Sequence, residues 1–222
     1  MFIGHFAVAL AAKKAAPKTS LAVLIAGAQL VDLIWPVMLL LGLEHVRIDI
    51  GNTVVTPLDF YDYPITHSLL GAVSWSLLFG GIYYFIKRLP REAVVLGLVV
   101  FSHWLLDLLS HRPDLPLTTS ASTKFGLGLW NSFAGTMAVE FGMFGIGAYL
   151  YMAATKAADK TGTYALASLL IFLTAMHLGN LFGPPPPNVE MIAVAGNAMW
   201  LFVLWGWWID KHRISRESAT LI

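Results

Sequence analysis

The chain has 222 residues, of which 57% are hydrophobic and only 12% are charged, and its mean hydropathy is +0.70. Soluble domains carry about 25% charged residues, so this composition predicts an integral membrane protein. The lack of cysteine excludes disulfides, cysteine zinc sites and thiol nucleophiles. A net charge of +1, without a basic aromatic patch, gives no reason to expect a nucleic-acid partner.

The hydrophobic pattern predicts an all-α, polytopic protein with about seven helices in a single transmembrane domain, residues 1–222. The first helix runs from Phe2 to Ala16 and contains His5. At about 1.5 Å per residue it barely crosses a hydrocarbon core about 30 Å thick, so it either spans thinly or re-enters. Because this run already contains His5 and lacks a basic leading region, we predict no cleavable signal peptide.

The second helix is predicted from Ser20, its N-cap, to about Leu43, with Asp32 inside it. Asp32 has no Lys or Arg nearby in its helix, so it needs a partner on another helix or a cation. Pro36 lies four residues later and cannot donate to the Asp32 carbonyl. A kink or break is therefore expected beside the carboxylate.

A polar loop at residues 44–64 separates this helix from the third. The loop acids are expected to be solvated: Asp49, Asp59 and Asp62. The third helix opens at Pro64 or Thr66, contains His67 and reaches Ile86.

The fourth helix contains the stretch F-S-H-W-L-L-D-L-L-S-H-R-P, from Phe101 to Pro113. His103, Asp107 and His111 are four residues apart, so each step advances about 40° and all three project from one helix face. A histidine and a carboxylate one turn apart form a metal-chelating pair, and ionisable residues inside a membrane are usually functional. For His111 alone, a polar helix end among lipid headgroups is an equally good interpretation.

Three more helices are expected at about residues 131–155, 162–182 and 189–210, after a loop at 112–130. The first contains Glu140, which is interpreted either as a catalytic carboxylate or as a protonated carboxyl bonded to a neighbour. The second contains His177, for which a structural role is favoured.

Eleven of the 14 Lys and Arg residues fall on one side of this layout. They lie at 13–18, 87–91, 156–160 and 211–216, and the positive-inside rule makes this side, with the C-terminus, cytoplasmic. The other three lie opposite: Arg47, Arg112 and Lys124. The candidate histidines and acids then lie at mid-depth or in the outer, periplasmic half of the membrane.

Four motifs occur together in the first half of the chain: G-H-F at 4–6, the Asp32 helix, Y-P-I-T-H-S-L-L at 63–70 and S-H-W-L-L-D at 102–107. This combination resembles the YdjM-like family of bacterial inner-membrane proteins, which are described as metal-dependent hydrolases from their His and Asp pattern. The resemblance implies a metal site, carried mostly by residues 1–113, of His5, Asp32, His67, His103 and Asp107. The family often has a P-D-x-D-like segment where this chain reads Q-L-V-D-L-I-W-P, so one acid is missing here.

We therefore expect a membrane-bound hydrolase with one or two divalent ions, zinc being the first choice. The predicted ligands are His5, Asp32, His67, His103, Asp107 and His111. The ion would activate water to attack an ester or phosphoester, with Glu140 or Asp32 as general base. A site at headgroup depth suggests that the substrate is a lipid or a lipid-linked molecule of the surrounding bilayer.

Two alternatives use the same residues. The first is a transporter or permease for protons or metal cations, which a broken helix at Pro36 favours. It is disfavoured because the intramembrane acids are expected on one side only, whereas a pathway must cross the membrane. The second is a structural or stress-response membrane protein with a vestigial site. The sequence leaves the substrate, the number of metal ions and the oligomeric state open.

Overall fold

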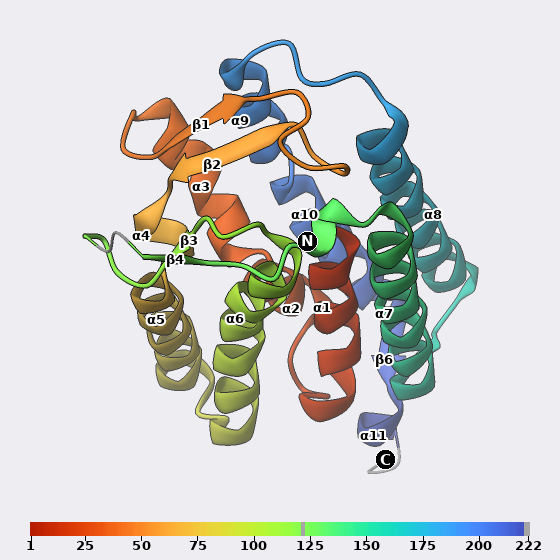
Figure 1. The fold of residues 1–222 in the computed structure, drawn as a ribbon. Coiled ribbons are helices and arrows are strands. Elements are labelled where there is room, and N and C mark those ends of the chain that lie inside the picture. The colour runs from red at the N-terminus through yellow and green to blue at the C-terminus, as the bar shows by residue number, and fades with distance from the viewer. Residues whose placement is uncertain (121–122, 220–222) are drawn as a thin grey trace.

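A computed structural model describes residues 1–120 and 123–219, and helices dominate this part of the chain (Figure 1). The helices are α1 (Ile3–Ala15), α2 (Leu21–Ala28), α3 (Leu30–Leu40), α4 (Pro64–His67), α5 (Leu69–Lys87), α6 (Pro90–Ser110), η1 (Leu129–Asn131), α7 (Phe133–Ala154), α8 (Lys160–Phe182), α9 (Val189–Asn197), α10 (Trp200–His212) and α11 (Arg216–Ala219). Short strands pair as β1 (His45–Ile48) with β2 (Leu58–Asp62), β3 (Leu115–Pro116) with β4 (Lys124–Phe125), and β5 (Thr155–Ala157) with β6 (Arg213–Ser215). The predicted all-α, polytopic membrane class is confirmed.

Five helical segments of the described chain are long and apolar enough to cross a membrane: α5, α6, α7, α8 and the α9–α10 unit. The α2–α3 pair makes a sixth if it is counted as one bent span. Large apolar side chains cover the outward faces, and Leu77, Ile171 and Leu201 are each more than 60% exposed. The expected number of about seven spans is too high, because α1 has only 13 residues.

α1 lies inside the bundle, where it packs against α7, α2 and α6 (Figure 1). Phe6 and Leu10 of this helix are almost fully buried in the largest apolar cluster. The close approach of α1 to α7 depends on Gly147, because a Cβ atom at that position would lie 2.4 Å from the Ala7 carbonyl oxygen. A short helix is thus tolerated because protein, rather than lipid, surrounds it.

The second apolar segment bends by 56° between α2 and α3. Ser20 caps α2 as predicted, since its side chain accepts from the Val23 amide. The segment does break near Asp32, but the break is at Gln29, three residues before it. The expectation that Pro36 causes the break is wrong, because α3 continues through Pro36. Gln29 leaves the helical conformation, with φ −103° and ψ 7°, and Pro36 instead packs against α9.

The two ends of the bundle differ in their connections (Figure 1). The β1–β2 hairpin, α4, the β3–β4 pair and the α8–α9 connection lie at one end, called here the hairpin end. The basic connections α1–α2, α5–α6 and α7–α8 lie at the other end with the C-terminal segment. The basic connections thus lie at one end, as the prediction of orientation assumed. That this end is cytoplasmic stays a prediction.

Candidate metal centre

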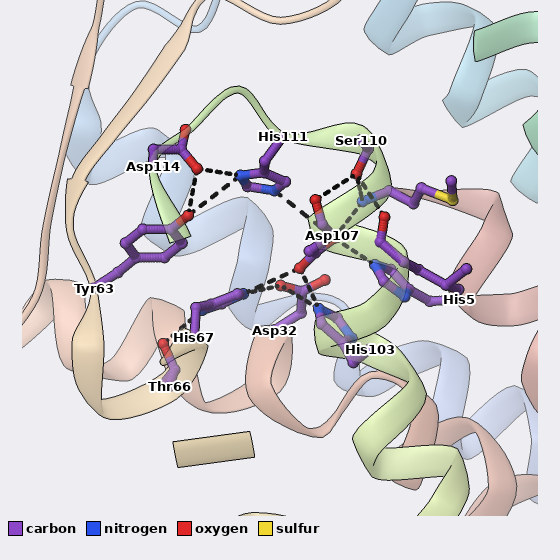
Figure 2. A network of polar contacts seen from close by, with 12 residues as sticks. His5, Asp32, Tyr63, Thr66, His67, His103, Asp107, Ser110, His111 and Asp114 are labelled. Carbon is purple, nitrogen blue, oxygen red and sulfur yellow. Dashed lines mark hydrogen bonds and ion pairs between the residues drawn. The ribbon is translucent and has the colours of Figure 1, made fainter. Parts of the chain in front are cut away.

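The six predicted ligands converge at the hairpin end from α1, α3, α4 and the last turns of α6 (Figure 2). Five of them are histidine or aspartate side chains with 1–6% exposure: His5, His67, His103, Asp107 and His111. Asp32 differs, because its side chain is 26% exposed. The i, i+4 spacing does bring His103 and His111 to Asp107, although α6 ends at Ser110 and His111 is the residue that follows it.

Four ligand atoms face one another in the lower part of this cluster. Asp32 Oδ1 lies 3.3 Å from His67 Nε2 and 3.6 Å from His103 Nε2. Asp107 Oδ2 lies 3.8 Å and 3.1 Å from the same two nitrogen atoms. Ligands held at about 2.0–2.1 Å from zinc in a tetrahedron lie about 3.3 Å from one another. These four nitrogen–oxygen distances are therefore close to those around a tetrahedral ion, and the ligand atoms of Asp32, His67 and His103 all lie within 4.8 Å of one another.

The other ring nitrogen of His103 determines what its Nε2 can offer. His103 Nδ1 lies 2.8 Å from the Ala28 carbonyl oxygen at the α2–α3 bend. A carbonyl oxygen only accepts, so Nδ1 carries the proton and Nε2 of the neutral ring presents a lone pair. The bend thus orients His103, in the way that ligating histidines are oriented by a hydrogen bond at the other nitrogen.

His67 is oriented by a hydrogen-bonded chain that ends in a carboxylate. Glu44 accepts from the Ile65 amide at 2.7 Å, from the Thr66 amide at 2.9 Å and from the Thr66 hydroxyl at 2.6 Å. Because that hydroxyl donates to Glu44, its oxygen accepts from His67 Nδ1 at 2.7 Å. His67 Nε2 is therefore left with a lone pair, and it faces Asp32 and Asp107.

His111 is held by a third anchor. Its Nδ1 donates to Asp114 Oδ1 at 2.9 Å, and the Tyr63 hydroxyl donates to the same oxygen at 2.8 Å. Burial, followed by the nearby Asp114 carboxylate, raises the pKa of Tyr63 well above its ordinary value of 10.0, which keeps its hydroxyl a donor. His111 Nε2 then faces Asp107 Oδ1 at 3.7 Å. The interpretation of His111 as a headgroup-level helix end is not supported, since the ring is 3% exposed and Trp130 packs on it.

The second oxygen of Asp107 has partners of its own. Oδ1 lies 2.6 Å from the amino nitrogen of Met1 and 3.1 Å from His5 Nε2. The His5 ring stacks on His103 with centroids 3.6 Å apart and planes 3° from parallel. His5, His103 and Asp107 thus form a second set of potential ligands, which shares His103 with the set of Asp32, His67 and His103.

Glu140 and His177 lie on the α7 and α8 side of the site. Glu140 is 1% exposed, and its Oε2 accepts from the Phe2 and Gly4 amides, at the start of α1. A carboxylate at a helix N-terminus is favourable, so part of its role is to hold α1. His177 is buried against Phe2 and Phe141. The role of Glu140 as a general base stays a prediction.

The sequence analysis did not identify the residues that orient the histidines. Two of them had a local signal, since Thr66 precedes His67 and Asp114 lies three residues after His111. Glu44 had none, because it reaches Thr66 from 22 residues away. The expected solvation of Asp59 is also wrong, because it is 1% exposed and ion-paired with Arg47 and Arg112.

A cavity of about 660 Å³ adjoins the cluster. Asp32, His67, Asp107 and His111 line its polar end, together with Glu140. The remaining wall comes largely from apolar residues of α3, the β1–β2 connection, α8 and α9. This volume is in the range of about 300–1,000 Å³ that is usual for small-molecule sites.

No protein-family model, curated protein or solved structure matches this chain. Membership of the YdjM-like family therefore stays a prediction, and the functional argument rests on the geometry of the site.

Proposed function

We propose that this protein is a membrane-bound, metal-dependent hydrolase whose ion is held by Asp32, His67, His103 and Asp107. The observation that supports it is the direction of the lone pairs. The Nδ1 atoms of His67 and His103 are used by Thr66 and Ala28, so both Nε2 lone pairs point at carboxylate oxygens. Lone pairs at about 3–4 Å in a buried site repel one another unless a cation lies between them.

A proton could take the place of the ion at one of these positions. An imidazolium at His103 would pair with both Asp32 and Asp107, as in an internal ion-pair network. The hydrogen bonds at Nδ1 favour the ion, because they fix neutral histidines in the tautomer that ligates through Nε2. The donor set, two imidazoles and two carboxylates, suits Zn²⁺ first.

Bound at this position, a divalent ion would lower the pKa of a water molecule and stabilise negative charge on an ester or phosphoester oxygen. A catalytic zinc ion keeps one coordination position for water. Asp32, the partly exposed acid at the cavity, would therefore give up its position on the ion to that water and accept a proton from it. In ester hydrolysis the water oxygen bonds to the acyl carbon and the acyl C–O bond breaks. One water proton goes to the leaving alkoxide, and the acid product releases the other.

The bilayer provides the context for a lipid or lipid-linked substrate. The cavity is walled by α8 and α9, which both belong to candidate membrane spans.

We further propose that the protein is located in the bacterial inner membrane, with the hairpin end periplasmic and the C-terminus cytoplasmic. Reporter fusions after residues 91, 160 and 216 should be active only as cytoplasmic reporters. A C-terminal reporter that is active only in the periplasm would reverse this orientation.

The transporter alternative is stronger than the sequence indicated. Glu92 in the first turn of α6 is 6% exposed, and Asp210 lies in α10, so intramembrane acids are not confined to the hairpin end. Asp210, however, accepts from the Ala22 amide at the start of α2, which gives it a structural role. Between the ends lies a core of apolar residues such as Leu24 and Leu96, rather than a chain of relay groups.

The test compares metal content and hydrolysis in purified protein. Wild type should contain a stoichiometric divalent transition metal and hydrolyse p-nitrophenyl esters or phosphoesters, and a chelator should abolish this activity until zinc is restored. The H103A/D107A double variant should lack both metal and activity. H45A/D62A is the matched control, because it removes an exposed His–Asp pair whose atoms are 2.8 Å apart. Wild type without bound metal, or with chelator-insensitive hydrolysis, would refute the proposal.

A further inference from the structure

The charge of the cavity wall carries information about the substrate. No Lys or Arg occurs among the described residues that line the cavity. Three carboxylates line it: Asp32, Asp107 and Glu140. The basic side chains of the hairpin end are used elsewhere. Arg47 and Arg112 pair with Asp59, and Lys124 donates to the Tyr61 carbonyl. The Met1 ammonium pairs with Asp107 at 2.6 Å, so this ammonium and one divalent ion balance the three carboxylates and leave no positive charge over.

The rest of the wall is apolar and adaptable. Trp35, Phe60 and Trp130 line one part, and Met176, Met191 and Met199 line another. Methionine side chains are flexible and polarisable, so they can pack against apolar chains of different shapes. Such a wall stabilises a hydrocarbon chain and offers no Lys or Arg side chain to a charged headgroup.

Two helices of candidate membrane spans, α8 and α9, line the cavity. Gly179 of α8 and Gly183, which directly follows α8, line the cavity, and Met191 and Ala195 line it from α9. The two helices are joined only by the proline-rich connection at 183–188, which passes over the hairpin end (Figure 1). Phe182, the last residue of α8, and Val194 of α9 are 69% and 53% exposed. A hydrophobic molecule could therefore enter from the membrane between α8 and α9.

We propose that the substrate is a lipid carboxylic ester with an uncharged headgroup, which enters between α8 and α9 with its acyl chain in the cavity. This inference rests on the proposed hydrolase function. A phosphate monoester carries a charge of about −1.5 to −2 at neutral pH, and the site has no positive charge left to balance it. A neutral ester carbonyl adds no charge before reaction and needs only the ion to stabilise the negative charge that develops.

The first experiment measures hydrolysis by the zinc-loaded protein in nanodiscs. We expect kcat/KM to rise about two- to fourfold per methylene from p-nitrophenyl acetate to the octanoate, as apolar area is buried. p-Nitrophenyl phosphate should be at least about 100-fold poorer than the octanoate. Phosphate hydrolysis as fast as ester hydrolysis, or no dependence on chain length, would overturn the inference while leaving the hydrolase function intact.

A pair of glycine variants tests the location of the chain. A Cβ atom at Gly179 meets open space, so G179L should extend into the cavity without a clash. It should lower kcat/KM for the octanoate by about tenfold and for the acetate by less than about twofold. G145L on α7 is the matched control, because its Cβ also meets open space but Gly145 does not line the cavity. Equal losses for both esters would place the chain elsewhere.

A binding measurement separates failure of this inference from failure of the proposed function. The probes are a long-chain alkyl ether, which cannot be hydrolysed, and the alkyl phosphate of the same length, each displacing a fluorescent fatty-chain reporter. If no ester is hydrolysed, stronger displacement by the ether that is lost in G179L would support the substrate class and refute only the hydrolase. Stronger displacement by the phosphate, or none by either probe, would refute the substrate class.

Discussion

Two groups of buried carboxylates at the hairpin end are neutralised in different ways. Asp59 is 1% exposed and is paired with Arg47 Nε at 2.6 Å and with Arg112. Asp107 is 2% exposed, but its Oδ2, like Asp32 Oδ1, faces the ring nitrogens of histidines. A guanidinium is charged at any physiological pH, whereas a histidine whose Nδ1 proton is already donated offers Nε2 as a lone pair.

This difference indicates which carboxylates require a cation that the chain itself does not provide. A buried charge is tolerated when it is paired, and the Asp59 group is complete with its two arginines. The Asp32 and Asp107 pair is incomplete. The Met1 ammonium is paired with Asp107 Oδ1, but Asp107 Oδ2 and Asp32 Oδ1 face the Nε2 lone pairs of histidines. The first arrangement is a structural ion pair that holds the hairpin over the site, and the second is a cage for a cation.

Loss of a ligand should give the largest effect. Single alanine substitutions at His67, His103 or Asp107 should weaken metal binding by at least about 100-fold, since loss of an orienting partner alone typically costs about 10–100-fold. Titration with a competing zinc indicator measures the affinity. D59A, the corresponding change in the complete group, should leave the affinity unchanged. Unchanged affinity in all three ligand variants would remove the distinction between the groups.

Removal of the ion should destabilise the cage but not the ion pair. An ion at about 100 times its dissociation constant stabilises the native state by about 2.7 kcal/mol, or about 5–10 °C in Tm for a chain of this size. A chelator should therefore lower the Tm of wild type and of D59A by similar amounts. D32N should respond much less, because it removes a ligand and relieves the repulsion. Thermal unfolding in detergent, with and without chelator, measures these shifts. A wild-type Tm that the chelator does not change would favour the transporter alternative.

The ion pair of Asp59 with Arg47 and Arg112 should contribute less to the free energy of unfolding than the bound metal ion does. Arg47 and Arg112 are partly exposed, so D59A should lower stability by about 1–2 kcal/mol, below the 3–5 kcal/mol typical of a fully buried pair. The loss should be reduced at high salt, because both arginines reach solvent. Denaturation in detergent at two salt concentrations measures it. A coincident loss of bound metal in D59A would show that the two groups act as one.

The smallest effect is expected from the orienting chain of His67. T66V removes the oxygen that accepts from His67 Nδ1 while keeping the side-chain volume, and it should weaken metal binding by about tenfold. T174V is the matched control, because its hydroxyl bonds only to the Leu170 carbonyl of its own helix. Equal affinities in T66V and wild type would mean that the ring is held by packing rather than by Thr66 and Glu44.

The membrane class and the alignment of His103, Asp107 and His111 could be predicted from the sequence, because both depend on local properties. Composition decides whether a helix prefers lipid, and a rotation of 100° per residue decides which side chains share its face. His5, Asp32 and His67 were predicted as ligands from their motifs, and the structure brings all of them to the same cluster.

Tertiary structure alone decided how these residues are oriented and which charges need an ion. The bend at Gln29 turns the Ala28 carbonyl toward His103, and Glu44 reaches Thr66 across a hairpin. Asp59 is buried because that hairpin pairs Arg47 with it and folds back on Arg112. Each of these contacts joins segments far apart in the chain, and no pattern within a single helix encodes them. Whether an acid is solvated, ion-paired or free to bind a metal depends on which groups the fold brings against it.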